Sequence, residues 1–175
     1  MTEQNVLEIL TRAMIVEQDG YNFYQAAADR VADEKGKKML RGLAGDEEEH
    51  LRILQNEYAK VSQGKPFVDL EEARRTLPAQ PELKLFPEKS QLSSMLDRAT
   101  DDEGALRVAL DFELKGYNMY KEAAGKAADD NARTVFDYLA KQEDQHYALI
   151  QQTLNYLVDN GVWFFQDLEK PFFEG

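Results

Sequence analysis

The sequence contains the same pattern twice, 96 residues apart. Residues 17–50 align with residues 113–146 without a gap. The motif Glu-x-x-Gly-Tyr-Asn-x-Tyr begins at Glu17 and again at Glu113, and Leu-Ala-x-x-Glu-x-x-His begins at Leu43 and again at Leu139. A chain that repeats a unit of this length is expected to fold into two similar halves related by pseudo-two-fold symmetry.

The spacing inside each repeat is helical. One stripe contains Leu10, Ala13, Glu17, Gly20 and Tyr24, at alternating steps of three and four residues, which is typical of a helix packed along one face. Similar stripes cover residues 40–61, 106–127 and 136–157. We therefore predict an all-α protein, a four-helix bundle over residues 1–159 made of two duplicated helical hairpins, 3–63 and 102–159.

The two hairpins are separated by residues 64–101, which contain four of the five prolines. This segment is predicted to be a long crossover with a short helix near Leu70–Leu77. It must travel the length of the bundle, roughly 40 Å for helices of this size, for the halves to face each other. The last helix is expected to end at Asn160–Gly161. Residues 160–175 are rich in aromatic side chains and are expected to pack on the bundle or a partner subunit, with Trp163 as an anchor.

Composition excludes several classes of function. Acidic residues outnumber basic ones by 33 to 21, and the net charge of -12 argues against nucleic acid as a partner. With no cysteine, the sequence offers no disulfide, thiolate nucleophile or iron–sulfur ligand. No apolar run is long enough to span a membrane, and the first residues do not resemble a secretory signal, so a cytoplasmic location is expected.

Each of the four helical stripes carries a carboxylate where an apolar residue is expected. These residues are Glu17, Glu47, Glu113 and Glu143, and both histidines, His50 and His146, share the same stripes. Burying four carboxylates without a cation is too costly, and no Lys or Arg occupies these stripes. Two metal ions would supply the charge, because Glu and His three residues apart lie on one helix face. The alternative is a hydrogen-bonded polar layer without metal.

The ligand types favour iron. One Glu from each of two helices, with Glu-x-x-His from each of the other two, is the di-iron carboxylate arrangement. Carboxylates with one imidazole per metal suit two iron ions, with manganese or zinc possible in a purified sample. The neighbouring acidic run, Asp46–Glu49, is expected to face solvent except for Glu47.

From Leu7 to Leu157, these motifs resemble the ferritin-like domain of the rubrerythrins, specifically single-domain members without a rubredoxin module. The resemblance implies that Glu47 and Glu143 bridge two irons, that Glu17 and Glu113 are terminal ligands, and that His50 and His146 each bind one iron. It also implies that Tyr24 and Tyr120 donate hydrogen bonds to ligand carboxylates. Rubrerythrins reduce hydrogen peroxide to water with electrons from a rubredoxin-type site.

Two features depart from the family pattern. Since cysteine is absent, electrons would have to come from an external donor, such as a rubredoxin-like protein or a reductase. Rubrerythrins also carry an extra Glu where this chain has Gly116, and Gly20 occupies the equivalent position in the first half. Mid-helix glycine is unfavourable by about 1 kcal/mol relative to Ala, so the pair needs a reason. Either the helices approach closely there, or the missing side chains leave room for an oxidant.

Three functions remain open from the sequence. A di-iron oxidoreductase would reduce hydrogen peroxide, or dioxygen more slowly. A non-catalytic protein would bind or oxidise ferrous iron and pass it on, as ferritins do. A scaffold with a vestigial site would bind no metal. A homodimer is expected, in which the hairpins could be exchanged across the long crossover.

Overall fold

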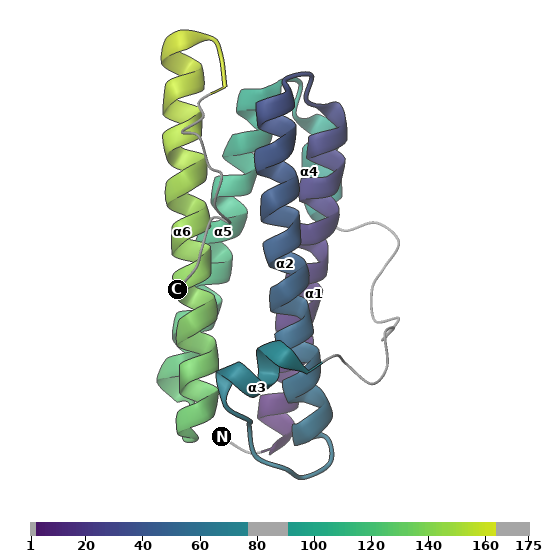
Figure 1. The fold of residues 1–175 in the computed structure, drawn as a ribbon, viewed down its shortest axis with the longest axis vertical. Coiled ribbons are helices and arrows are strands. Elements are labelled where there is room, and N and C mark those ends of the chain that lie inside the picture. The colour runs from purple at the N-terminus through teal and green to yellow at the C-terminus, as the bar shows by residue number, and fades with distance from the viewer. Residues whose placement is uncertain (1–2, 77–90, 164–175) are drawn as a thin grey trace.

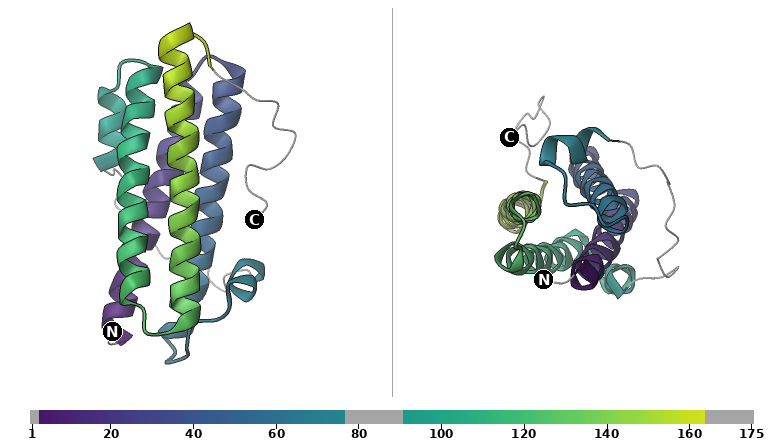
Figure 2. Two further views of the ribbon diagram at one scale, coloured as in Figure 1. Left: turned by 90° about the vertical axis from the view of Figure 1, so that its left-hand side faces the viewer. Right: turned by 90° about the horizontal axis from the view of Figure 1, so that it is seen from below.

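The computed structural model describes residues 3–76 and 91–163, and within these ranges all regular structure is helical. Four long helices run side by side along the molecule (Figures 1 and 2). They are α1 (Glu3–Arg30), α2 (Glu34–Val61), α5 (Asp102–Lys126) and α6 (Asp130–Asn160). The predicted all-α bundle is therefore confirmed.

The long helices begin where the sequence places capping residues. Asp33 accepts hydrogen bonds from the first backbone N–H groups of α2, and Asp129 does the same for α6. These two caps are themselves 96 residues apart, so the duplication extends to the turn of each hairpin. The end of α6 is as predicted: Gly161 has a φ of 69°, a left-handed conformation that glycine adopts without strain.

The crossover contains two short helices. The first, α3 (Leu70–Arg75), lies where a short helix is predicted and packs near the end of α2 (Figure 1). The second, α4 (Gln91–Arg98), is not predicted by the sequence analysis and packs against α1 and α5. It is held there by Arg30 of α1, whose guanidinium donates hydrogen bonds of 2.6 Å to the Leu96 carbonyl and 2.8 Å to the Ala99 carbonyl.

The apolar core is divided into two clusters. One cluster, which includes Phe23, Leu43 and Ile150, occupies the end of the bundle where α2 begins and α6 ends. The other, which includes Leu10, Leu54 and Phe136, occupies the opposite end. In every long helix the residues between the two clusters include the glutamate identified from the sequence. The core therefore consists of two apolar ends and a central polar layer.

The predicted anchor after α6 is in place. Trp163 is 7% exposed and packs against Gly36, and its indole N–H donates a 2.9 Å hydrogen bond to Asp102. The rest of the predicted aromatic tail, residues 164–175, lies outside the described residues. Within the described residues, no helix combines the length and the apolar character needed to cross a bilayer.

Candidate metal centre

The polar layer is built by all four long helices. Each helix contributes one glutamate, and α2 and α6 each add the histidine that lies three residues further on. All six residues are at most 1% exposed: Glu17, Glu47, His50, Glu113, Glu143 and His146. The residues predicted from the helical stripes are therefore brought together in one buried layer.

Their donor atoms form two overlapping groups. The first group contains Glu17, Glu47, His50 and Glu143, and the second contains Glu47, Glu113, Glu143 and His146. In each group the potential ligand atoms lie within 4.8 Å of one another, which is close enough to surround one metal ion. Glu47 and Glu143 belong to both groups. The layer can thus hold two ions that share two carboxylates.

The imidazoles point the same ring nitrogen into the layer. Nδ1 of His50 lies 3.2 Å from Glu17, 3.3 Å from Glu47 and 3.4 Å from Glu143. Nδ1 of His146 lies 3.5 Å from carboxylate oxygens of Glu47 and Glu113. The two rings are stacked with their centroids 5.6 Å apart. Each histidine therefore offers Nδ1 to the same space that the glutamates surround.

Two tyrosines cross-connect the halves. The hydroxyl of Tyr24 on α1 donates a hydrogen bond to Oε1 of Glu113 on α5. In the mirror arrangement, Tyr120 on α5 donates to Oε1 of Glu17 on α1. Both tyrosines are fully buried. Each hydrogen bond fixes one oxygen of its glutamate and leaves the other oxygen directed at the histidine of the same group.

Burial and the neighbouring charges together shift the pKa values of most side chains in the layer in the direction that retains protons. Burial, and then the neighbouring carboxylate of Glu47, raise the pKa values of Glu17 and Glu143. Burial alone would lower the pKa values of the histidines, but Glu17 beside His50 and Glu113 beside His146 raise them well above the usual value. Without a metal ion, this layer retains protons that metal ions would displace.

The hydrogen bonding of the carboxylates tests whether metal ions fit. Among the described residues, both oxygens of Glu47, Oε2 of Glu113 and Oε1 of Glu143 are buried and make no hydrogen bond. The nearest cationic atoms to these oxygens are the imidazole Nδ1 atoms, at 3.3–3.5 Å. A polar layer that served only as structure would give each oxygen a hydrogen-bond donor, since a buried oxygen without one costs about 1–3 kcal/mol. Two cations would satisfy all of them. The donor set therefore fits a pair of metal ions better than a closed hydrogen-bonded layer.

The structure also corrects the interpretation of the acidic run. Only Glu48 in Asp46–Glu49 is largely exposed. Oδ2 of Asp46 lies 3.3 Å from Nε2 of His146, on the side of the ring away from the layer. Glu49 pairs with Arg74 of α3 at 2.8 Å, and Arg74 lies over the Tyr138 ring. The sequence carries no signal for the Asp46 contact, because the partner is 100 residues away and Asp46 lies beside the helical stripe.

Both mid-helix glycines mark close approaches. A Cβ on Gly116 would lie 2.5 Å from Oε2 of Glu143, so this backbone makes room for a carboxylate of the layer. A Cβ on Gly20 would lie 2.8 Å from the Phe112 ring and 3.3 Å from Glu47. The first alternative from the sequence, close approach, therefore holds at both positions.

The chain is similar to known proteins in both sequence and structure. The sequence profile described as Rubrerythrin matches residues 8–154. A hypothetical protein from Pyrococcus furiosus is similar in structure, with a TM-score of 0.63, 22% identity, and coverage of 88% of this chain and 90% of that one. A dodecameric thioferritin, the bacterioferritin-related protein from Bacteroides fragilis, has a TM-score of 0.65, 16% identity, and coverage of 92% and 89%. No curated protein sequence matches the chain.

Proposed function

Since this chain belongs to the rubrerythrin family, we propose that it is a non-haem di-iron protein that reduces hydrogen peroxide, or dioxygen more slowly. The observation that carries the proposal is the pair of overlapping donor groups that share Glu47 and Glu143. Sharing two carboxylates keeps two ions close enough to act on one small oxidant, which a single-ion site cannot do.

In this proposal each residue has a defined part. Glu47 and Glu143 would each help to hold both ions, because they are the members common to both groups. Glu17 with His50, and Glu113 with His146, complete one position each. Tyr24 and Tyr120 are positioning residues: by donating to Glu113 and Glu17, they hold one oxygen of each terminal carboxylate in place.

In the proposed chemistry the two ions would supply both electrons, and solvent water would supply the protons. Bound iron would supply Lewis-acid activation and one electron per ion, so that one hydrogen peroxide and two protons yield two waters. The protein keeps the reaction apart from solvent, since the six donor residues are at most 1% exposed. Returning the ions to the ferrous state requires an external donor, which we propose is a rubredoxin-like protein or a reductase, because the chain has no cysteine.

The test is anaerobic loading with ferrous ion followed by one equivalent of hydrogen peroxide or by air. Optical and Mössbauer spectra should show two iron ions per chain oxidised together, and faster by peroxide than by air. Oxidation of iron that is then released, or equal rates with both oxidants, would instead favour the second function below.

The second function is iron handling, in which the chain binds or oxidises ferrous iron and passes it on. The similar fold of a protein described as a dodecameric thioferritin favours it. Storage needs a closed shell of many subunits, whereas we propose a homodimer. Light scattering at micromolar concentration distinguishes the homodimer from a storage shell. A mass near twice 20.1 kDa supports the homodimer, and a dodecamer favours storage. A monomer contradicts both assemblies.

A further inference from the structure

One surface pocket reaches the wall of the polar layer. It has a volume of about 330 Å³ and lies where α1, α4 and α5 meet. Its lining includes Gly116, Phe112 and Val16. The volume is roughly ten times that of one water molecule in the liquid, so several small molecules fit.

Gly116, in the lining of this pocket, also lies against a proposed metal ligand. The nearest atoms to a Cβ built on Gly116 all belong to Glu143, beginning with Oε2 at 2.5 Å. Gly116 therefore lines the pocket and also touches one of the two carboxylates shared by both donor groups. A side chain at this position would collide with the Glu143 carboxylate.

The two halves of the duplication differ in side-chain size at one pair of positions that line this pocket or face its equivalent. Phe112 and Val16 are equivalent in the repeat, as are Gly116 and Gly20. The Phe112 ring covers Gly20, where a Cβ would lie 2.8 Å from two of its atoms. The equivalent cover for Gly116 would come from Val16, whose isopropyl group is much smaller than the benzyl group of Phe112. Accordingly, Gly116 lines the pocket and Gly20 does not.

The charges around the pocket do not favour an ion. Two cationic side chains, Arg12 and Lys115, are balanced by two anionic ones, Asp19 and Asp111. Lys115 and Asp111 already pair at 2.6 Å. The floor formed by Val16, Phe112 and Gly116 is uncharged, so the pocket suits a small neutral molecule better than a metal cation.

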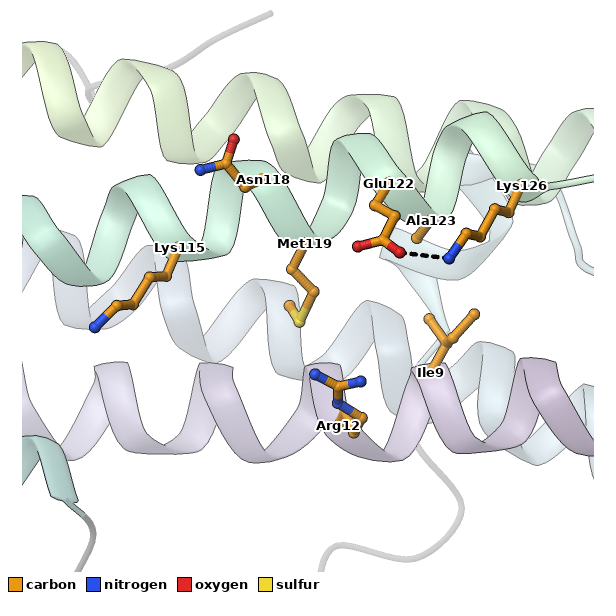
Figure 3. A pocket seen from close by; sticks show the side chains of 8 residues that line it. All are labelled: Ile9, Arg12, Lys115, Asn118, Met119, Glu122, Ala123 and Lys126. Atoms are coloured by element: carbon orange, nitrogen blue, oxygen red, sulfur yellow. Dashed lines mark hydrogen bonds and ion pairs between the residues drawn. The ribbon is translucent and has the colours of Figure 1, made fainter.

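A neighbouring pocket provides a comparison (Figure 3). It has a volume of about 320 Å³, lies between α1 and α5, and is lined by Ile9, Asn118 and Glu122 among others. Figure 3 shows Glu122 paired with Lys126 across its rim. This pocket is not lined by Gly116 or by any residue of the polar layer. Ile9 and Val16 are both half-buried residues of α1, two helical turns apart.

We propose that the pocket at Gly116 is the passage by which a small uncharged oxidant, such as hydrogen peroxide or dioxygen, reaches the buried layer. The proposal rests on the function proposed above, because it assumes that metal ions occupy the layer. In this proposal both reasons given from the sequence for a glycine at position 116 apply. Glu143 approaches one face of Gly116 closely, and the other face leaves room for an oxidant.

The test uses nitric oxide, a neutral diatomic probe, on protein loaded anaerobically with ferrous ion. Val16→Phe should fill the pocket beside Gly116, just as the Phe112 ring covers Gly20. It should slow the absorption change caused by nitric oxide at least tenfold. Ile9→Phe, the matched control, should leave the rate within twofold of the parent. Phe112→Leu should widen the pocket and raise the rate, which keeps the test decisive if Val16→Phe does not fold.

The outcomes separate the two proposals. Ferrous iron should bind the parent, Val16→Phe and Ile9→Phe to the same stoichiometry. If the parent binds no iron, the proposed function fails. If all variants bind iron and neither Val16→Phe nor Phe112→Leu changes the nitric oxide rate, the passage is wrong while the metal centre stands.

Discussion

The carboxylate of Asp46, on α2, lies 3.3 Å from Nε2 of His146, on α6. This contact lies on the outer side of the imidazole, while Nδ1 faces the carboxylates of the polar layer. A carboxylate in this place holds the proton on Nε2 and orients Nδ1 toward the polar layer, as a metal-binding imidazole requires. The residue equivalent to Asp46 in the second half of the duplication is Gln142 on α6, so the two halves differ by one charge at this position.

The first prediction concerns this contact. Asp46→Asn should weaken one of the two metal positions about tenfold to a hundredfold, the usual effect of losing such a partner, and leave the other unchanged. Calorimetric titration with Co²⁺ should therefore separate into two steps in the variant. Asp144→Asn removes the same charge from an exposed site and is the control. Identical titrations for Asp46→Asn and the parent would contradict the role of Asp46.

The second prediction concerns the tyrosine pair. Tyr24→Phe or Tyr120→Phe removes the donor to Glu113 or Glu17 and leaves a buried oxygen unpaired. Each substitution should lower the free energy of unfolding of the metal-free protein by about 1–3 kcal/mol. Urea denaturation measures this. Tyr21→Phe, at a half-buried position, should change it by less than about 0.5 kcal/mol. Equal effects at all three positions would rule out the proposed hydrogen-bonding role.

The third prediction concerns a buried acid outside the layer. Glu57 has no exposed surface, and its Oε2 accepts a 3.2 Å hydrogen bond from the Val68 N–H. Burial, reinforced by the charges of Asp129 and Glu72, raises the pKa of Glu57 to about 8 from a reference of 4.5. The folded state then binds the proton more tightly than the unfolded state. Glu57 therefore makes stability fall as the pH rises from about 4.5 to about 8, by at most about 1.4 kcal/mol per pH unit.

Glu57→Gln isolates this contribution from that of the polar layer. Relative to the parent, the metal-free variant should gain stability steadily between pH 5 and pH 8, as measured by urea denaturation at each pH. Glu48→Gln, at an exposed position of α2, should track the parent throughout. A difference between Glu57→Gln and the parent that does not change with pH would show that Glu57 is ionised in the folded protein.

The residues of the polar layer could be predicted from the sequence because they interrupt an apolar pattern. A glutamate at a buried position such as Glu47 is conspicuous, and its repetition at Glu143 identifies the pair. The helical hairpins could be predicted for the same reason, since periodicity is a local property of the chain.

The features that could not be predicted depend on distant partners. Asp46 lies outside the helical stripe, and only the packing of α2 beside α6 brings it to His146. The eight-residue helix α4 is too short to be stable alone, and the hydrogen bonds from Arg30 that hold it come from another helix. The pocket beside Gly116 could not be predicted either, because Val16 and Gly116 line it from two different helices, α1 and α5.

The most direct test of the di-iron centre is the amount of iron bound per chain, determined by elemental analysis after anaerobic loading and desalting. The parent should bind two ions, one for each donor group. Glu47→Ala and Glu143→Ala should each lose most of both ions, because these residues belong to both groups, whereas Glu17→Ala and Glu113→Ala should each lose about one. Unchanged iron content in both Glu47→Ala and Glu143→Ala would contradict the shared metal centre.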